Sequence, residues 1–327
     1  MQDLKQSIIK KDKDLYAIFQ NEIKQTDDLA NILNIYNFKK KADKHYPHYI
    51  NQDIKTLKIA LLGGYTFYPL SQALEVFLMK YSISPSFFVG QYNSYRSEIF
   101  LKKNDLVSFD PDIIFVMPSL EEIHELNQNN TLFLDSKNII DNYVEDILKV
   151  CELANKINGA EIILSNFRSD GRHDLGPLRS KLNNSNNNFI HQINLLMGTR
   201  SPDYINICDS ELISQRLGTL LSSNLQGWFE SKQPGSNSFI YSLADEIAYL
   251  THFIYNPMKK VLVIDLDNTC WGGVIGDDGI EGIELGDTSA KGEAYKSFQK
   301  YIKSLQNVGI VLAVVSKNEW QVALDVF

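Results

Sequence analysis

Short, nearly continuous apolar runs alternate with longer amphipathic stretches over the middle of the chain. The runs are LKIALLG, SFFVGQY, DIIFVMP and EIILSNF. Strands that are apolar on both faces occur in parallel sheets covered by helices on each side. Between the runs, residues 68–81 and 136–157 have apolar side chains at helical spacing. The pattern predicts an α/β domain with a doubly wound parallel sheet over residues 56–235.

The first 55 residues have a different pattern, rich in charge, with apolar residues such as Leu15, Phe19 and Leu29 at roughly helical spacing. The pattern breaks at His45-Tyr46-Pro47-His48. We therefore expect a helical lead-in over residues 1–55.

A second α/β pattern follows the Pro234-Gly235 turn and a predicted helix over residues 242–255, which we expect to bridge two domains. It consists of the strand VLVI, a glycine-rich hairpin over residues 271–287, a helix over 290–307 and the strand IVLAVV. The sequence thus predicts a second doubly wound parallel-sheet domain over residues 236–327.

Composition and charge exclude several classes of protein. No apolar run is long enough to span a bilayer, and the N-terminus lacks the pattern of a secretory signal, so we expect a cytoplasmic protein. The net charge of −8 and the lack of a basic run with interleaved aromatic residues argue against nucleic-acid binding. Three widely separated cysteines argue against a disulfide framework or a zinc cluster.

The candidate chemistry is concentrated where the strand VLVI ends, at Asp265 and Asp267. Ligands of open α/β sheets bind at the carboxyl ends of the strands. Asp265 there can attack a phosphate as a carboxylate nucleophile, forming an aspartyl-phosphate. Asp267 can protonate the leaving oxygen and later activate water. Because an anion attacks another anion, we expect Mg²⁺, held by Asp265 and the Asp267 backbone carbonyl.

Ser316 ends the next strand and is followed by Lys317 and Asn318. Its hydroxyl and the backbone N–H groups at the start of a following helix are suited to binding phosphate. A helical crossover would bring this strand beside the one that ends in Asp265. Candidate phosphate-binding residues are Thr269, which we expect to secure the loop by hydrogen bonding, and Ser316, Lys317 and Asn318.

A D-x-D-x-T string alone is weak support, because acidic residues after strands often serve only in turns. The preceding apolar strand, the Trp271-Gly272-Gly273 sequence and the second strand ending in Ser-Lys-Asn favour a phosphate site. A calcium loop is excluded because Cys270 stands where a glycine is needed and Gly276 where a glutamate is needed.

Residues 261–286 and 316–318 resemble the haloacid-dehalogenase superfamily, specifically its FkbH-like branch (subfamily IIIC), whose signature is DLDNT-x-WGG-x-x-G-[ED]-DG. The resemblance implies Asp265 as nucleophile, Asp267 as acid/base and Ser316 as phosphate binder. It also implies a lysine and an acidic pair after the serine motif. Only eleven residues follow Ser316. We therefore expect this chain to be a fragment with little phosphatase activity.

FkbH-like proteins are associated with moving a glyceryl group from a phosphorylated glycerate to an acyl carrier protein, with release of phosphate. The resemblance therefore implies a phosphatase or a phosphate-releasing acyl transferase. Its partners would be a phosphorylated small molecule or acyl phosphate and an acyl carrier protein. The alternative is a non-catalytic carrier-protein or ligand-binding module whose phosphate site is vestigial.

Cys270 has two interpretations. It is a small buried hydrophobic residue, or it is a thiol that transiently accepts an acyl group beside the phosphate site.

The first domain resembles the degenerate SGNH-hydrolase-like domain that precedes the phosphatase domain in FkbH-like proteins. The resemblance rests on the strand and turn at residues 59–66, where Tyr65 and Thr66 stand in place of a serine nucleophile. A D-x-x-H string, Asp170 to His173, follows the fourth strand instead of closing the domain. We expect a binding or scaffold role, with Asn166 as a candidate pocket residue.

Overall fold

A computed structural model of the chain describes residues 15–45, 54–101, 104–126, 136–169, 176–183, 185–256, 259–324 and 326. It forms two compact units, Met1–Tyr255 and Asn256–Phe327. The boundary between these units lies after Tyr255, whereas we predicted a domain boundary at residues 235/236. Helix α13 (Asn237–Tyr255) belongs to the first unit because its buried face, including Ile240, Leu243 and Ile247, packs against α4 (Leu70–Leu78).

The described part of the first unit contains a five-stranded parallel sheet in the order β2-β1-β3-β4-β5. The strands from apolar runs are confirmed, whereas β5 was not predicted. The bounds are β1 (Lys55–Gly63), β2 (Ile83–Val89), β3 (Ile113–Met117), β4 (Glu161–Ser165) and β5 (Ile205–Cys208).

Both faces of this sheet are buried, which explains the continuous apolar runs. In β1, Ile59 and Leu61 face one hydrophobic cluster, while Ala60 and Leu62 face the other. Successive side chains of a strand point to opposite faces, so a strand buried on both sides has no polar positions to alternate with.

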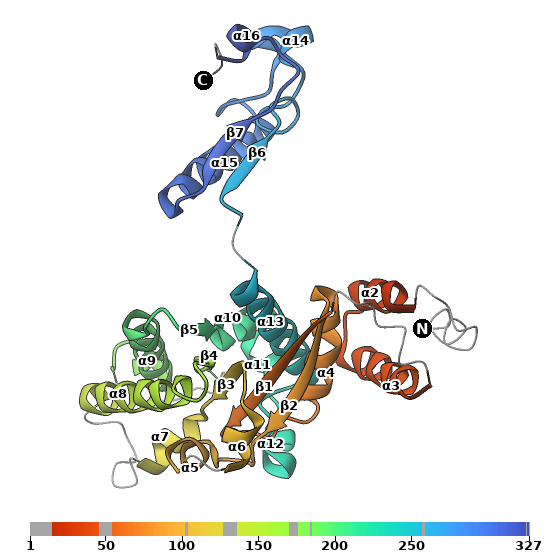
Figure 1. Ribbon diagram of the computed structural model, residues 1–327. Helices are drawn as coiled ribbons and strands as arrows, with labels where there is room; N and C mark the ends of the chain where they lie inside the picture. The colour runs from red at the N-terminus through yellow and green to blue at the C-terminus, as the bar shows by residue number, and fades with distance from the viewer. Residues whose placement is uncertain are drawn as a thin grey trace. The chain divides into compact units, whose positions relative to one another are not determined.

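Two helical layers cover the sheet (Figure 1). Helices α2 and α3 lie within the predicted helical lead-in and pack into the first layer, whereas residues 1–14 and 46–53 of that prediction lie outside the described residues. The first layer comprises α2 (Leu15–Gln25), α3 (Leu29–His45), α4, η2 (Met79–Tyr81), α10 (Ser210–Leu217) and α13. The second comprises α5 (Tyr95–Phe100), α6 (Asn104–Phe109), α7 (Leu120–Leu126), α8 (Ser136–Asn155) and α9 (Asn186–Arg200).

Three further short helices belong to the first unit. They are η3 (Gly176–Leu178), α11 (Thr219–Ser222) and α12 (Leu225–Ser231). None of the helices in the described part of the chain has the length and apolar character needed to cross a membrane.

The second unit contains two parallel strands, β6 (Val261–Ile264) and β7 (Val311–Val314), paired from Val261↔Val311 to Ile264↔Val314. One face packs on a small core that includes Trp271 and Ile302. On the other face, Val261, Val263 and Val311 are each more than half exposed. The helices are α14 (Ile275–Gly282), α15 (Ala290–Ser304), η4 (Leu305–Val308) and α16 (Trp320–Leu324).

The hairpin predicted over residues 271–287 is wrong in detail. A single antiparallel bridge joins Gly272 and Glu284, and helix α14 occupies the segment between them. The Val274 backbone N–H, at the N-cap of this helix, donates to Asp278 Oδ2 at 2.8 Å, and the helix is interrupted at Gly279 (φ 66°). The bond resembles the one by which a side chain of the first turn reaches back to the N-cap N–H.

Candidate functional site

The carboxyl ends of β6 and β7 bring the two predicted motifs of the second unit together. Asp265 is exposed and comes directly after Ile264, the last residue of β6. The Val315 N–H donates to the Ile264 carbonyl (3.0 Å), extending the parallel ladder by one residue. The register therefore sets Asp265 beside Val315, with Ser316 next along the chain.

Three donors fix the Asp267 carboxylate. Its Oδ1 accepts hydrogen bonds from the indole Nε1–H of Trp271 and from the Ile275 backbone N–H, both at 3.1 Å. Its Oδ2 accepts one from the Asn318 Nδ2 amide at 2.9 Å. Trp271 is fully buried, so this side of the carboxylate is held by the core of the unit.

Asn318 therefore makes a contact that differs from the predicted one. We expected it to bind phosphate, but its side-chain amide donates to Asp267 across 51 residues of sequence. Its backbone N–H donates to Ser316 Oγ at 3.1 Å, which orients the serine at the end of β7. Lys317, between them, is exposed.

The loop after Asp267 is a tight turn. The Thr269 and Cys270 N–H groups donate to the Leu266 carbonyl at 3.2 and 2.8 Å. Asn268 has a left-handed backbone (φ 54°), and its Oδ1 accepts from the Gly273 N–H at 3.0 Å. Asparagine tolerates this conformation better than most residues. The described contact of Thr269 is thus a backbone bond within the turn.

Cys270 lies beside the candidate nucleophile but is shielded from solvent. Its exposed fraction is 5%, and its Sγ–H donates to the Asp265 carbonyl at 3.5 Å. Burial, together with the negative charge of Asp265, raises the pKa of the thiol. Because the thiolate is the nucleophilic form, these observations favour the interpretation of Cys270 as a small buried hydrophobic residue.

The oxygen ligands available at this edge are few. Among the described residues, no group of three or more His, Cys, Asp or Glu side chains lies close enough together to hold a metal ion. The acidic side chains that directly follow β6 in the predicted motif are those of Asp265 and Asp267.

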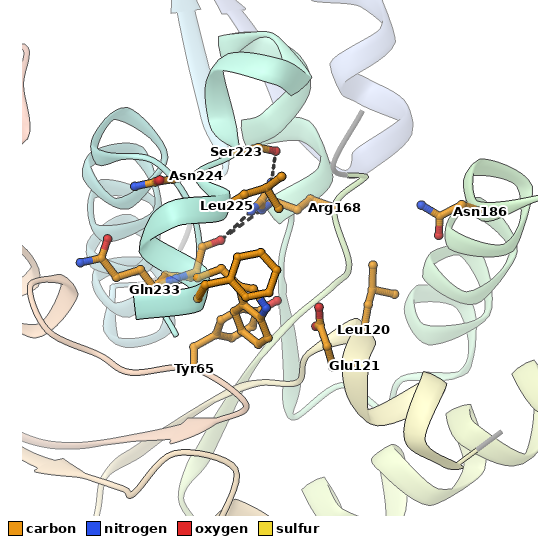
Figure 2. Close-up of a pocket in the computed structure, with 12 residues that line it drawn as sticks. Tyr65, Leu120, Glu121, Arg168, Asn186, Ser223, Asn224, Leu225 and Gln233 are labelled. Atoms are coloured by element: carbon orange, nitrogen blue, oxygen red, sulfur yellow. Dashed lines mark hydrogen bonds between the residues drawn. The ribbon is translucent and has the colours of Figure 1, made fainter. Parts of the chain in front are cut away.

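A cavity of about 320 Å³ lies in the first unit, beyond the carboxyl ends of β1, β3 and β4. Figure 2 shows Arg168 and Ser223 on one side of it and Tyr65 and Glu121 on the other. This site could not be predicted from the sequence, because most of its wall comes from residues 223–234, which have no strand or motif pattern. The lining residues are Tyr65, Leu120, Glu121, Arg168, Asn186, Ser223, Asn224, Leu225, Trp228, Phe229, Gln233 and Pro234.

The residues that we considered for hydrolase chemistry in the first unit do not form a nucleophilic site in the described part of the chain. The Thr66 hydroxyl donates to the Ser231 carbonyl at 2.5 Å. Asp170 to His173 lie outside the described residues. Asn166, the candidate pocket residue, does not line the cavity; its Nδ2 donates to Asp209 Oδ1 at 2.8 Å and so links β4 to the start of α10.

No protein-family model matches the chain, and no curated protein matches it. Among solved structures, the chain is similar to the N-terminal part of the protein BF1531 from Bacteroides fragilis, which contains a phosphatase domain and was crystallised in complex with Mg. The TM-score is 0.71 with 26% sequence identity, over 89% of this chain and 76% of that one.

Two hydrolases show a weaker likeness. The lipase Lip_vut3 from a goat rumen metagenome has a TM-score of 0.41 and 12% identity, over 60% of this chain and 98% of that one. A mutant of Axe2, an acetyl-xylooligosaccharide esterase from Geobacillus, has a TM-score of 0.39 and 15% identity, over 64% and 99%.

Proposed function

We propose that the chain contains the phosphate-transfer site of a magnesium-dependent phosphatase or phosphate-releasing acyl transferase of the haloacid-dehalogenase type, in its FkbH-like branch. The observation that carries the proposal is the hydrogen bond between Asn318 and Asp267, which joins the DLDNT and Ser-Lys-Asn motifs at one sheet edge. The similarity to a structure that contains a phosphatase domain supports it.

Asp265 is the proposed nucleophile. Its Oδ1 accepts the Leu266 backbone N–H at 2.8 Å, which fixes the carboxylate, and Oδ2 is the oxygen that attacks. A new bond forms between Oδ2 and phosphorus while the bond from phosphorus to the leaving oxygen breaks. The electron pair of that bond leaves with the oxygen, and Asp265 is left as an aspartyl-phosphate.

Asp267 is the proposed acid and base, and the geometry indicates which of its oxygens acts. A carboxylate oxygen has about two lone pairs for hydrogen bonding. Oδ1 already accepts from Trp271 and Ile275, whereas Oδ2 accepts from Asn318. The proton is therefore carried on Oδ2, first to an alkoxide leaving group and then from the water that hydrolyses the aspartyl-phosphate. Trp271 and Asn318 act as positioning residues.

Mg²⁺ fits this edge in part, because magnesium sites commonly use one or two carboxylates together with waters and substrate phosphate oxygens. The Asp265 carboxylate is exposed, and we propose that it and the Asp267 backbone carbonyl hold the ion. When bound, Mg²⁺ would offset the repulsion between the incoming phosphate and Asp265.

Because we expect little turnover from this chain, the test follows a single transfer: the chain is incubated with Mg²⁺ and acetyl phosphate, and the phosphate is located on the protein. An acyl phosphate suits this purpose because its leaving carboxylate needs no proton, so transfer to Asp265 does not depend on Asp267. Borohydride reduction converts an aspartyl-phosphate to homoserine, which mass spectrometry locates. We expect label at Asp265 and none in Asp265→Asn.

The Asp267→Asn variant separates the two roles. It should still be labelled by acetyl phosphate, but it should lose the label more slowly, because hydrolysis needs the base. Label at another residue, or undiminished label in Asp265→Asn, would contradict the proposal and favour a vestigial site. Phosphate release from acetyl phosphate, compared with that from a simple phosphate ester, then indicates whether acyl phosphates are the preferred donors.

A further inference from the structure

The cavity of the first unit lies where an open parallel sheet usually binds ligands. In the order β2-β1-β3-β4-β5, the chain moves from β1 to one side and then from β3 to the other. The crevice between the ends of β1 and β3 is the switch point at which such sheets bind ligands. Tyr65 follows β1, Leu120 and Glu121 follow β3, and Arg168 follows β4.

The aromatic wall of the cavity is held in place. The Tyr65 and Trp228 rings meet edge to face, with centroids 5.7 Å apart. Two hydrogen bonds tie the loop after β1 to the end of α12: the Thr66 N–H donates to the Lys232 carbonyl at 3.0 Å, and its hydroxyl donates to Ser231. The wall is thus formed before any ligand arrives, which lowers the cost of binding.

Arg168 is fixed with its charge at the cavity wall. Its Nε and Nη2 donate to the Pro234 carbonyl at 3.2 and 2.8 Å, and its Nη1 donates to Ser223 Oγ at 3.0 Å. The guanidinium also lies 4.7 Å from the centre of the Phe239 ring. A guanidinium held in this way is a preorganised site for a carboxylate or phosphate.

The remaining polar groups refine the ligand chemistry. Burial raises the pKa of Tyr65, so its hydroxyl stays protonated at neutral pH and is a hydrogen-bond donor. Among the twelve lining residues, Arg168 is the only cation and Glu121 the only anion. Figure 2 shows Glu121 apart from Arg168, on the side of α7. An anionic ligand would therefore be attracted by the Arg168 guanidinium on one wall and repelled by the Glu121 carboxylate on the other.

We propose that this cavity binds a small organic anion, with its carboxylate or phosphate on Arg168 and its apolar body against Tyr65 and Trp228. The volume, about 320 Å³, is at the lower end of the range for small-molecule sites. The anchoring chemistry is the same for a carboxylate and a phosphate ester. This site is independent of the phosphate-transfer site proposed above.

The test measures binding of four probes with the same ring and different charge: benzoate, phenyl phosphate, benzamide and benzylamine. Ligand-observed NMR titration of the full chain gives an affinity for each. We expect benzoate or phenyl phosphate to bind at least about tenfold more tightly than benzamide, as for a charge-assisted hydrogen bond. The ratio between benzoate and phenyl phosphate distinguishes the two anion classes.

Two variants assign the binding to the cavity. Arg168→Gln should lower the affinity for the preferred anion by about tenfold or more, while the affinity for benzamide should stay nearly unchanged. Because Arg168 also ties Pro234 and Ser223 together, unchanged benzamide binding shows that the cavity is intact. Glu121→Gln should increase the affinity for the anion severalfold, since it removes a like charge from the cavity wall. This opposite change cannot come from misfolding.

Several results would overturn the proposal. They are tighter binding of benzylamine than of both anions, wild-type anion affinity in Arg168→Gln, weaker anion binding in Glu121→Gln, and no binding of any probe.

Discussion

The two units hold their parallel sheets in different ways. In the first unit both faces of the sheet are buried, and the side chain of Phe115 in β3 is fully enclosed. In the second, β6 and β7 have one face on a small core, and the valines of the other face are exposed among the described residues. The candidate sites of the two units also differ in the interactions that hold them in shape.

The cavity of the first unit is shaped by packing, because loops from three strands and helix α12 surround it. The phosphate-transfer edge of the second unit depends on a few directed hydrogen bonds, with the Asp267 carboxylate at their centre. The structure of the first unit should be most sensitive to changes in packing, and the edge of the second unit should be most sensitive to loss of a single hydrogen bond. The following predictions test that contrast, from the largest expected effect to the smallest.

Removing a large side chain from the doubly covered sheet should have the largest effect. Phe115→Ala should destabilise the first unit by about 3–5 kcal/mol, because it leaves a cavity beneath Phe67, whose ring centroid lies 6.2 Å away. The matched change in the second unit, Val263→Ala at a side chain that is 56% exposed, should cost at most about 0.5 kcal/mol. Hydrogen exchange followed by mass spectrometry reports each unit separately. Equal losses of stability in the two units would show that their sheets do not differ in this way.

Trp271→Phe should keep an aromatic ring in the small core but remove the indole donor to Asp267. Loss of a hydrogen bond to a charged acceptor should destabilise the second unit by about 1.5–3 kcal/mol. It should also slow loss of phosphate from Asp265. The control is Trp228→Phe in the first unit, which should leave both the exchange of the second unit and the dephosphorylation rate unchanged. A variant with normal stability and rate would show that the indole does not position Asp267.

Asn318→Ala should have a smaller effect that is mainly on the rate. It removes the donor to Asp267 Oδ2, so dephosphorylation should slow by about fivefold, corresponding to about 1 kcal/mol for one hydrogen bond. Asn307→Ala, the same substitution at an exposed residue of η4, is the control. If Asn318 instead binds the phosphate, labelling by acetyl phosphate should fall more than dephosphorylation does.

Cys270→Ala should leave labelling of Asp265 unchanged, if the thiol is only a buried apolar group. The raised pKa of Cys270 has a definite sign: at neutral pH the thiolate fraction is below that of an ordinary cysteine, and it grows as the pH rises. Alkylation by iodoacetamide without Mg²⁺ should therefore be slow at pH 7 and faster in alkaline solution. Rapid alkylation at pH 7, or loss of labelling in the variant, would restore the acyl-acceptor hypothesis.

Much of the fold follows from local pattern. The runs at β1, β3 and β4 are readable because strands buried on both faces have no polar positions. The sequence INIC of β5 has only four residues and a polar Asn206, so it resembles a loop. The placement of α13 was misjudged because an apolar helical face shows that a helix packs, but not against what.

The candidate sites likewise have some features that follow from local sequence pattern and others that depend on tertiary packing. The position of Asp265 and Ser316 at one sheet edge was predictable because each follows an apolar strand, and parallel pairing brings such strand ends together. The contact of Asn318 with Asp267 was not predicted, because a side-chain amide can donate to a phosphate or to a carboxylate and the sequence does not show which one it meets. The cavity was missed because Arg168 and Trp228 meet through tertiary packing.

The hydrogen bond from Thr66 to Ser231 joins residues 165 positions apart, and this separation sets an order of events during synthesis. The strands beneath the cavity emerge from the ribosome well before α12 and Pro234, which complete its wall. Contacts between distant residues form late because a long loop must close first. The cavity therefore cannot become competent to bind until the chain has been synthesised through Pro234 and this distant contact has closed.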